Sequence, residues 1–128
     1  MAAKRIRVLA ADHNALLREG LAAIIQVHED MELVAVVESN SEAVRIFRYG
    51  KPDVVLIDLD LPLPAGVDAI RRIRQIDPEV GVLGLCTYED SEVREQALRA
   101  GASRFMTKDM LTRDLIEMIR QCCSRRAK

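Results

Sequence analysis

Polar residues that could do chemistry stand where short apolar runs of the sequence end. Asp12 and His13 follow the first run, Asp58 the third, Cys86 closes the fourth, and Lys108 follows the fifth. A carboxylate that faces a lysine could act as a nucleophile, as a metal ligand or as both. One such residue would mean little, because polar residues often follow strands simply to cap the next helix. Several of them brought to one place would indicate a site.

The elements that must position these residues follow from the apolar pattern. Short apolar runs predict five strands, at 6–11, 33–37, 54–57, 80–85 and 105–107. Between them, apolar residues repeat at helical spacing, as Val67, Ile70 and Ile73 do. Strands that alternate with helices and are apolar on both faces imply a parallel sheet covered on both sides. We therefore predict an α/β fold, a (βα)₅ doubly wound parallel sheet. Ligands bind beyond the carboxyl ends of its strands.

Helix ends carry their own signals. Ser41 is the predicted N-cap of the second helix, and the Gly50-Lys51-Pro52 segment is predicted to end it. Gly101 follows the fourth helix as a C-terminal cap would.

Composition limits the classes of protein. The 128 residues are 49% hydrophobic, which fits one globular domain whose core needs no disulfide or metal. A formal net charge of −1 argues against nucleic-acid binding by the chain as a whole. The three cysteines have neither disulfide nor zinc-ligand spacing, which favours a reducing cytosol. No apolar stretch approaches the roughly 20 residues of a membrane span, so we expect a cytoplasmic protein without membrane contact.

The sequence resembles a response-regulator receiver domain of the CheY-like type. Segment 52–62, followed by Gly66, has that family's spacing from aspartate to proline to glycine. Segments 100–102 and 105–109 match its fifth-strand signature, and 17–21 resembles the branch that usually carries a LuxR-type helix-turn-helix output. The likeness implies a flavodoxin-like sheet of order 2-1-3-4-5. It places a receiver domain at 1–123, with 124–128 as a tail or the start of a linker to an output domain.

The resemblance also implies roles for particular residues. Asp58 would accept a phosphoryl group from a phosphohistidine on a sensor histidine kinase, with Lys108 offsetting the charge. Mg²⁺ would be held by Asp12, Asp58 and the backbone carbonyl of Asp60, whose side chain we expect to be solvated. Phe105 takes the place of the family's rotating aromatic residue, although it could equally be a packing residue.

Two positions depart from the family. His13 stands where the family has a second acid that ligates the metal directly, and imidazole suits softer transition metals better than Mg²⁺. We therefore expect weaker Mg²⁺ binding. Cys86 stands at the switch position of Thr or Ser, and a thiol is a weaker hydrogen-bond donor. Thr87 is expected to point to the opposite face of the strand. Cys86 could instead be a redox thiol that Lys108 favours as a thiolate, or a small buried apolar residue.

Several functions stay open at this point. The leading hypothesis is a non-enzymatic signalling receiver whose phosphorylation switches the surface of the fourth helix, fifth strand and fifth helix. It could form a homodimer there or through the first and fifth helices, and regulate transcription through a DNA-binding output domain outside this chain. The alternative is a pseudo-receiver that binds partners without phosphorylation. A flavodoxin-like electron carrier or hydrolase is disfavoured, because aromatic residues total 3% and the first loop, 12–15, is not glycine-rich. Whether the chain is a fragment or a complete receiver stays open.

Overall fold

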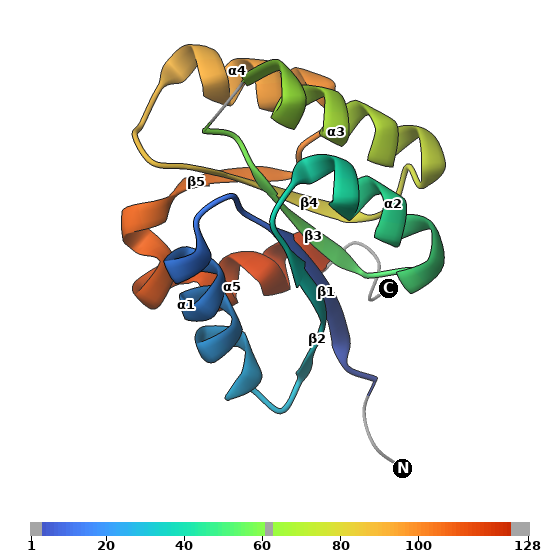
Figure 1. Ribbon diagram of the computed structural model, residues 1–128, viewed down its shortest axis with the longest axis vertical. Coiled ribbons are helices and arrows are strands. Elements are labelled where there is room, and N and C mark those ends of the chain that lie inside the picture. Colours follow the sequence, from blue (N-terminus) through green and yellow to red (C-terminus); the bar gives the residue numbers. More distant parts are fainter. Residues whose placement is uncertain (1–3, 61–62, 124–128) are drawn as a thin grey trace.

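A five-stranded parallel sheet forms the centre of the molecule (Figure 1). The computed structural model describes residues 4–60 and 63–123. The strand order is β2-β1-β3-β4-β5, which confirms the predicted order. The strands are β1 (Ile6–Ala11), β2 (Met31–Val37), β3 (Val54–Asp58), β4 (Gly81–Cys86) and β5 (Arg104–Thr107).

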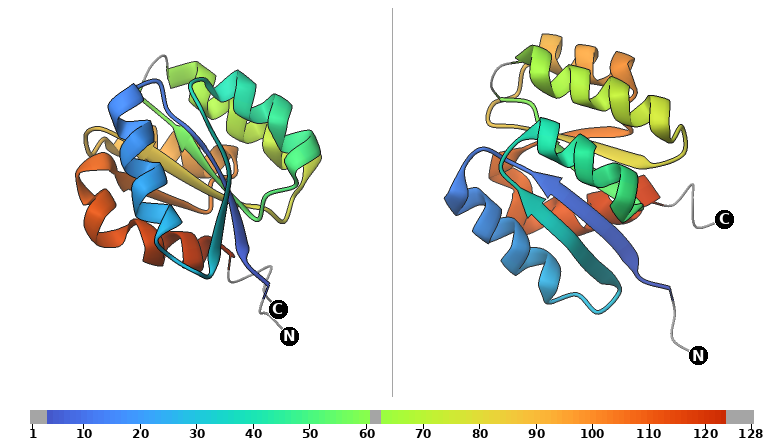
Figure 2. Two further views of the ribbon diagram at one scale, coloured as in Figure 1. Left: turned by 60° about the horizontal axis from the view of Figure 1, so that its bottom comes forward. Right: turned by 45° about the vertical axis from the view of Figure 1, so that its right-hand side comes forward.

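Helices cover both faces of this sheet (Figure 2). They are α1 (Ala15–Gln26), α2 (Asn40–Gly50), α3 (Leu63–Ile76), α4 (Ser91–Ala100) and α5 (Leu111–Cys123), with a short 3₁₀ helix, η1 (Lys108–Met110), before α5. Helices α1 and α5 pack in one apolar cluster. Helices α2, α3 and α4 pack in the other, on the opposite face. The predicted doubly wound architecture is confirmed.

The central strands are buried on both faces, which is why the sequence shows them as continuous apolar runs. In β3, Val55 and Ile57 pack against the α2–α4 layer, whereas Val54 and Leu56 pack against α1 and α5. Successive side chains of a strand point to opposite faces. Each fully buried aliphatic side chain contributes about 1.5–3 kcal/mol to the stability of the fold. The two apolar layers therefore fix the positions of the strands, and with them the residues at the strand ends.

Helix ends follow local hydrogen bonding. Ser39, not Ser41, caps α2: its side chain accepts the Glu42 N–H at 3.1 Å. The prediction for Ser41 is wrong because Ser39 and Glu42 have the spacing of a capping box, and Ser41 already lies inside the helix. Gly101 caps α4 as predicted, with a φ of 120° that favours glycine.

The register places the carboxyl ends of the strands at one edge. Asp58 of β3 lies opposite Leu85 of β4, and Cys86 of β4 lies opposite Thr107 of β5. Across the described ranges, no helix is both long and apolar enough to cross a bilayer. Pro62 of the aspartate–proline–glycine spacing and the predicted tail at 124–128 lie outside the described residues.

Candidate functional site

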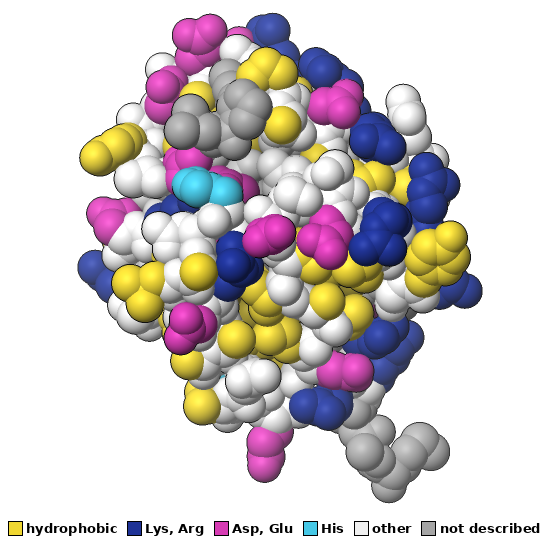
Figure 3. All heavy atoms as spheres, in the orientation of Figure 1, with side chains coloured by type: hydrophobic (Ala, Val, Ile, Leu, Met, Phe, Trp, Pro, Cys, Tyr) yellow, Lys and Arg dark blue, Asp and Glu magenta, His cyan; other side chains and the backbone are white. Residues whose placement is uncertain are grey.

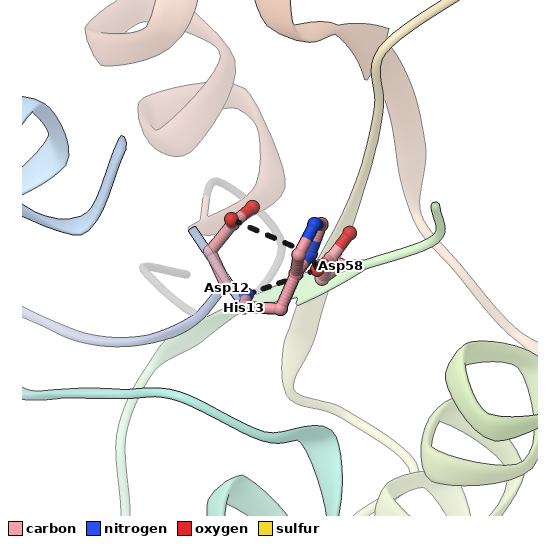
Figure 4. A group of neighbouring side chains, drawn as sticks. All are labelled: Asp12, His13 and Asp58. Carbon is pink, nitrogen blue, oxygen red and sulfur yellow. Dashed lines mark hydrogen bonds and ion pairs between the residues drawn. The ribbon is translucent and has the colours of Figure 1, made fainter. Parts of the chain in front are cut away.

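The predicted site residues at the ends of β1, β3 and β5 meet at the carboxyl edge of the sheet. Figure 4 shows three of them, with His13 between the carboxylates of Asp12 and Asp58. Asp12 is 0% exposed and Asp58 is 5% exposed, whereas the His13 side chain is about half exposed. Two buried carboxylates side by side need positive charge nearby to stay ionised.

Lys108 supplies that charge. Its Nζ lies 2.6 Å from Asp12 Oδ2, 3.0 Å from Asp58 Oδ1 and 2.6 Å from Asp60 Oδ2. Burial alone would lower the pKa of Lys108, but the three carboxylates outweigh it and raise the pKa. The lysine is therefore a permanent cation that joins residues following β1, β3 and β5.

Asp58 is held as an anion by several donors. Its Oδ1 accepts the Asp60 N–H at 2.9 Å and the Lys108 ammonium at 3.0 Å. Its Oδ2 accepts the His13 N–H at 3.1 Å and also hydrogen-bonds His13 Nδ1. Burial would raise the pKa of Asp58, yet the hydrogen bonds from His13, Asp60 and Lys108 lower it. An ionised carboxylate at this edge can act as a nucleophile.

Asn40, at the start of α2, fixes the backbone of Asp58. The Asn40 amide donates to the Asp58 carbonyl at 2.8 Å and accepts the Asp58 N–H at 3.3 Å. Asn40 was not among the predicted site residues. An asparagine at the start of a helix is common for local reasons of helix capping. Nothing in the spacing links Asn40 to Asp58, which lies 18 residues away.

His13 brings an imidazole to this edge of the sheet, next to both buried carboxylates. The hydrogen bond to Asp58 raises the pKa of His13 from 6.5, against the opposing effect of burial. Ligand atoms of Asp12, His13 and Asp58 lie within 4.8 Å of one another, so this group could hold a metal ion. Two carboxylates suit a hard cation, but an imidazole suits a transition ion. The donor set therefore fits a divalent transition metal better than Mg²⁺.

The expectation of a solvated Asp60 side chain is wrong. Asp60 Oδ1 accepts the Thr87 N–H at 2.7 Å, and Oδ2 accepts the Thr87 hydroxyl at 2.6 Å and the Lys108 ammonium at 2.6 Å. Burial would raise the pKa of Asp60, but these donors lower it to about 2. The side chain is only 12% exposed.

Thr87 also departs from expectation. Strand alternation predicted that its side chain would point away from the site, yet its hydroxyl bonds Asp60. The reason is that β4 ends at Cys86, so the alternation of a strand no longer governs the next residue. The hydroxyl missing at position 86 is thus present one residue later, but directed at Asp60.

Cys86 is a poor candidate for a thiolate. It is 7% exposed at the end of β4. Burial raises the pKa of its thiol, the neighbouring Asp60 raises it further, and Lys108 only partly opposes them. The interpretation of Cys86 as a redox thiol favoured by Lys108 loses its physical basis.

Phe105 lies in the apolar layer beneath α4. The side chain is 5% exposed, and the Arg94 guanidinium lies 4.8 Å from its ring centroid. Arg94 also donates two hydrogen bonds to Glu89, at 3.1 and 3.2 Å. A cation over a ring is attracted by its π face. Phe105 is therefore linked to the α4 surface through Arg94.

A cavity of about 280 Å³ opens beside Asp58, between α2 and α3. His13, Asn40 and Arg72 are among the residues that line it. Basic side chains gather over α2 and α3 on this face of the molecule (Figure 3). Glu38 and Asp68 also line the cavity, so its charge is mixed.

The chain is similar to known proteins in sequence. Residues 8–120 match the family model described as the response regulator receiver domain. Transcriptional regulatory protein LnrK of Bacillus subtilis (strain 168) is 32% identical over 114 residues, which are 89% of this chain and 52% of LnrK. Transcriptional regulatory protein DegU of Brevibacillus brevis is 34% identical over 116 residues, 91% of this chain and 49% of DegU. The chain thus spans about half the length of these curated relatives.

Solved structures are similar over nearly the whole chain. A two-component response regulator of the LuxR family from Aurantimonas sp. SI85-9A1 has a TM-score of 0.86 at 31% identity, covering 94% of this chain and 86% of that one. The response regulator domain of Thermotoga maritima CheB has a TM-score of 0.85 at 30% identity, covering 94% of this chain and 98% of that one. Both sets of relatives lead to one family.

Proposed function

This chain belongs to the receiver-domain family of response regulators, and we propose that it accepts a phosphoryl group on Asp58 from a phosphohistidine of a sensor histidine kinase. One observation carries the proposal. A buried aspartate, whose pKa is lowered by its donors, lies 3.0 Å from a lysine ammonium at the ligand-binding edge of the sheet. That pairing suits a nucleophile whose product carries extra negative charge.

The proposed transfer is an in-line displacement. A carboxylate oxygen of Asp58 attacks phosphorus and forms an O–P bond. The P–N bond of the donor breaks, and its electron pair stays on the nitrogen, so a ring protonated on its other nitrogen leaves as neutral imidazole. Lys108 remains protonated and offsets the negative charge of the phosphoryl oxygens. Asn40 holds the Asp58 backbone, and therefore the attacking carboxylate, in place.

A divalent cation would be held by Asp12, Asp58 and the backbone carbonyl of Asp60, with His13 as a nitrogen ligand. When bound, it would offset charge on the phosphoryl oxygens. The mixture of oxygen and nitrogen donors supports weak Mg²⁺ binding and a preference for ions that accept imidazole.

Signalling would act through the surface of α4, β5 and α5. In this proposal, phosphorylation shifts the surface of α4, β5 and α5, where Phe105 packs beneath Arg94, and that surface, or the face of α1 and α5, forms a homodimer. The names of the relatives and the half of their length that this chain spans support a regulator of transcription that contacts DNA through an output domain outside this chain, and we place it in the cytoplasm as part of this proposal. The receiver itself would be a phosphorylated switch, residues 1–123, and not a turnover enzyme.

Acetyl phosphate tests the proposal without a kinase. Incubation with Mg²⁺, and in parallel with Mn²⁺, should give a phosphoryl adduct that hydroxylamine removes, because an acyl phosphate is a mixed anhydride. The adduct should be absent from Asp58→Asn. If the wild-type chain forms no adduct with either cation, the proposal is wrong.

A phosphorylation-independent pseudo-receiver is the second candidate, favoured by one observation. Both oxygens of Asp58 already accept hydrogen bonds, from His13 on one side and from Asp60 and Lys108 on the other. A nucleophile must free a lone pair before it attacks. The absence of an adduct in the same assay would favour this second function.

A further inference from the structure

Three donors from two strand ends converge on the side chain of Asp60. They are the ammonium of Lys108, after β5, and the N–H and O–H of Thr87, after β4. An ammonium, an amide N–H and a hydroxyl are the groups that bind anionic oxygens best in proteins. The Asp60 carboxylate uses both of its oxygens to engage all three.

The same donors adjoin the atom that would carry the phosphoryl group. Lys108 Nζ lies 3.0 Å from Asp58 Oδ1 and 2.6 Å from Asp60 Oδ2. The Asp60 N–H donates to Asp58 Oδ1 at 2.9 Å. A group attached to that oxygen would therefore have the Asp60 residue and the Lys108 ammonium as immediate neighbours.

We propose that the Asp60 carboxylate is a built-in anion that occupies the donors needed by the phosphoryl group and so limits phosphorylation of Asp58. This inference rests on the proposed function of Asp58. Two anions that share one ammonium at this distance repel each other. Phosphorylation must therefore displace Asp60 from Lys108 and Thr87, or proceed without those donors.

The Asp60 carboxylate also links Lys108 to Thr87, since both residues donate hydrogen bonds to it. Asp60 bridges the ends of β4 and β5 as a bound phosphoryl group would, because it offers two anionic oxygens to donors on both strands. Asp60 acts here as a positioning residue and not as a catalytic one. Its effect should depend on its charge more than on its size.

The test compares labelling rates with saturating acetyl phosphate and Mg²⁺. Asp60→Asn, which keeps the size and loses the charge, should label about tenfold faster than the wild type, a factor that corresponds to removing one modest electrostatic competitor. Asp60→Glu, which keeps the anion, should stay within about twofold of the wild type.

Glu89→Gln is the matched control, because it removes an acid from the β4–α4 loop, which also carries Thr87, but Glu89 contacts Arg94; it should not change the rate. Asp60→Ser replaces Asp60→Asn if that variant is unfolded by circular dichroism.

A second readout separates this role from a merely structural one. The backbone amide signal of Thr87 in an NMR spectrum should shift in Asp60→Asn and should shift in the wild type on phosphorylation, since both release the same hydrogen bond. Equal labelling rates for wild type and Asp60→Asn would overturn this inference and leave the function of Asp58 intact. No label on either protein would overturn both.

Discussion

At the scale of single residues, His13 distinguishes this acceptor site from the family pattern. His13 and Lys108 flank Asp58 from opposite oxygens, whereas the family pattern places a second acid where His13 stands. The carboxylate that would attack phosphorus thus already has hydrogen-bonding partners on both oxygens before any metal ion binds. Charge supplied by side chains reduces the attraction for a metal ion.

Replacement of His13 tests that balance. His13→Asp should raise the affinity for Mg²⁺ by about tenfold or more, because it puts an oxygen ligand in place of an imidazole, which Mg²⁺ disfavours. His28→Asp is the matched control, since His28 is the other histidine of the chain and lies after α1, away from this edge. Calorimetric titration with Mg²⁺ and Zn²⁺ measures both affinities. We expect Zn²⁺ to lose its advantage in His13→Asp; unchanged Mg²⁺ affinity would contradict the account of His13.

The residues that the sequence placed correctly and those it missed differ for a physical reason. Asp12, Asp58 and Lys108 follow buried strands, so parallel topology alone brings them together. The side-chain contacts of Asp60 and Thr87 depend on loop conformation beyond the strand ends, where neither alternation nor periodicity applies. The wrong expectations for these two residues both arise there.

At the scale of elements, a polar side chain at the start of α2 hydrogen-bonds the end of β3. Asn40 is the first residue of α2, and it pairs with both the N–H and the carbonyl of Asp58. The helix packs on the sheet through Val44 and Phe47. Strands and helices could be predicted because their apolar faces repeat with a fixed period, but this polar link has no period to reveal it.

Loss of the Asn40 amide should weaken this connection. Asn40→Ala leaves the N–H and carbonyl of Asp58 without their partner, which should cost about 1–3 kcal/mol of unfolding free energy. Urea denaturation followed by circular dichroism measures the change. Ser41→Ala, at the next and exposed position, is the control and should fall within about 0.5 kcal/mol of the wild type. Equal stability of the two variants would contradict the role given to Asn40.

At the scale of the whole molecule, Lys108 ties together the polar residues that follow three strands. Asp12 lies after β1, Asp58 and Asp60 lie at the end of β3, and all three carboxylates contact the ammonium of Lys108, which follows β5. The apolar layers set the distance between the strands, and the lysine makes their carboxylates compatible. Removal of one partner from such a buried network leaves charges without compensation.

Replacement of that lysine should therefore destabilise the fold as a whole. Lys108→Met should lower the unfolding free energy by about 3 kcal/mol, because three acids then lie together without the ammonium that they share. Added divalent cation should restore part of the loss, since it can take the place of the ammonium. Urea denaturation with and without Mn²⁺ measures both effects, and Lys4→Met, an exposed lysine, should change neither. A stable Lys108→Met protein that is insensitive to Mn²⁺ would contradict this account.

The measurement that tests the central claim most directly is the position of the phosphoryl group after treatment with acetyl phosphate. Borohydride reduces an acyl phosphate of aspartate to homoserine, which peptide mass spectrometry can place in the sequence. We predict homoserine at position 58 in the wild type and at no position in Asp58→Asn. Recovery of unmodified Asp58 from a fully treated sample, or a label on His13 in place of Asp58, would contradict the claim that Asp58 is the acceptor.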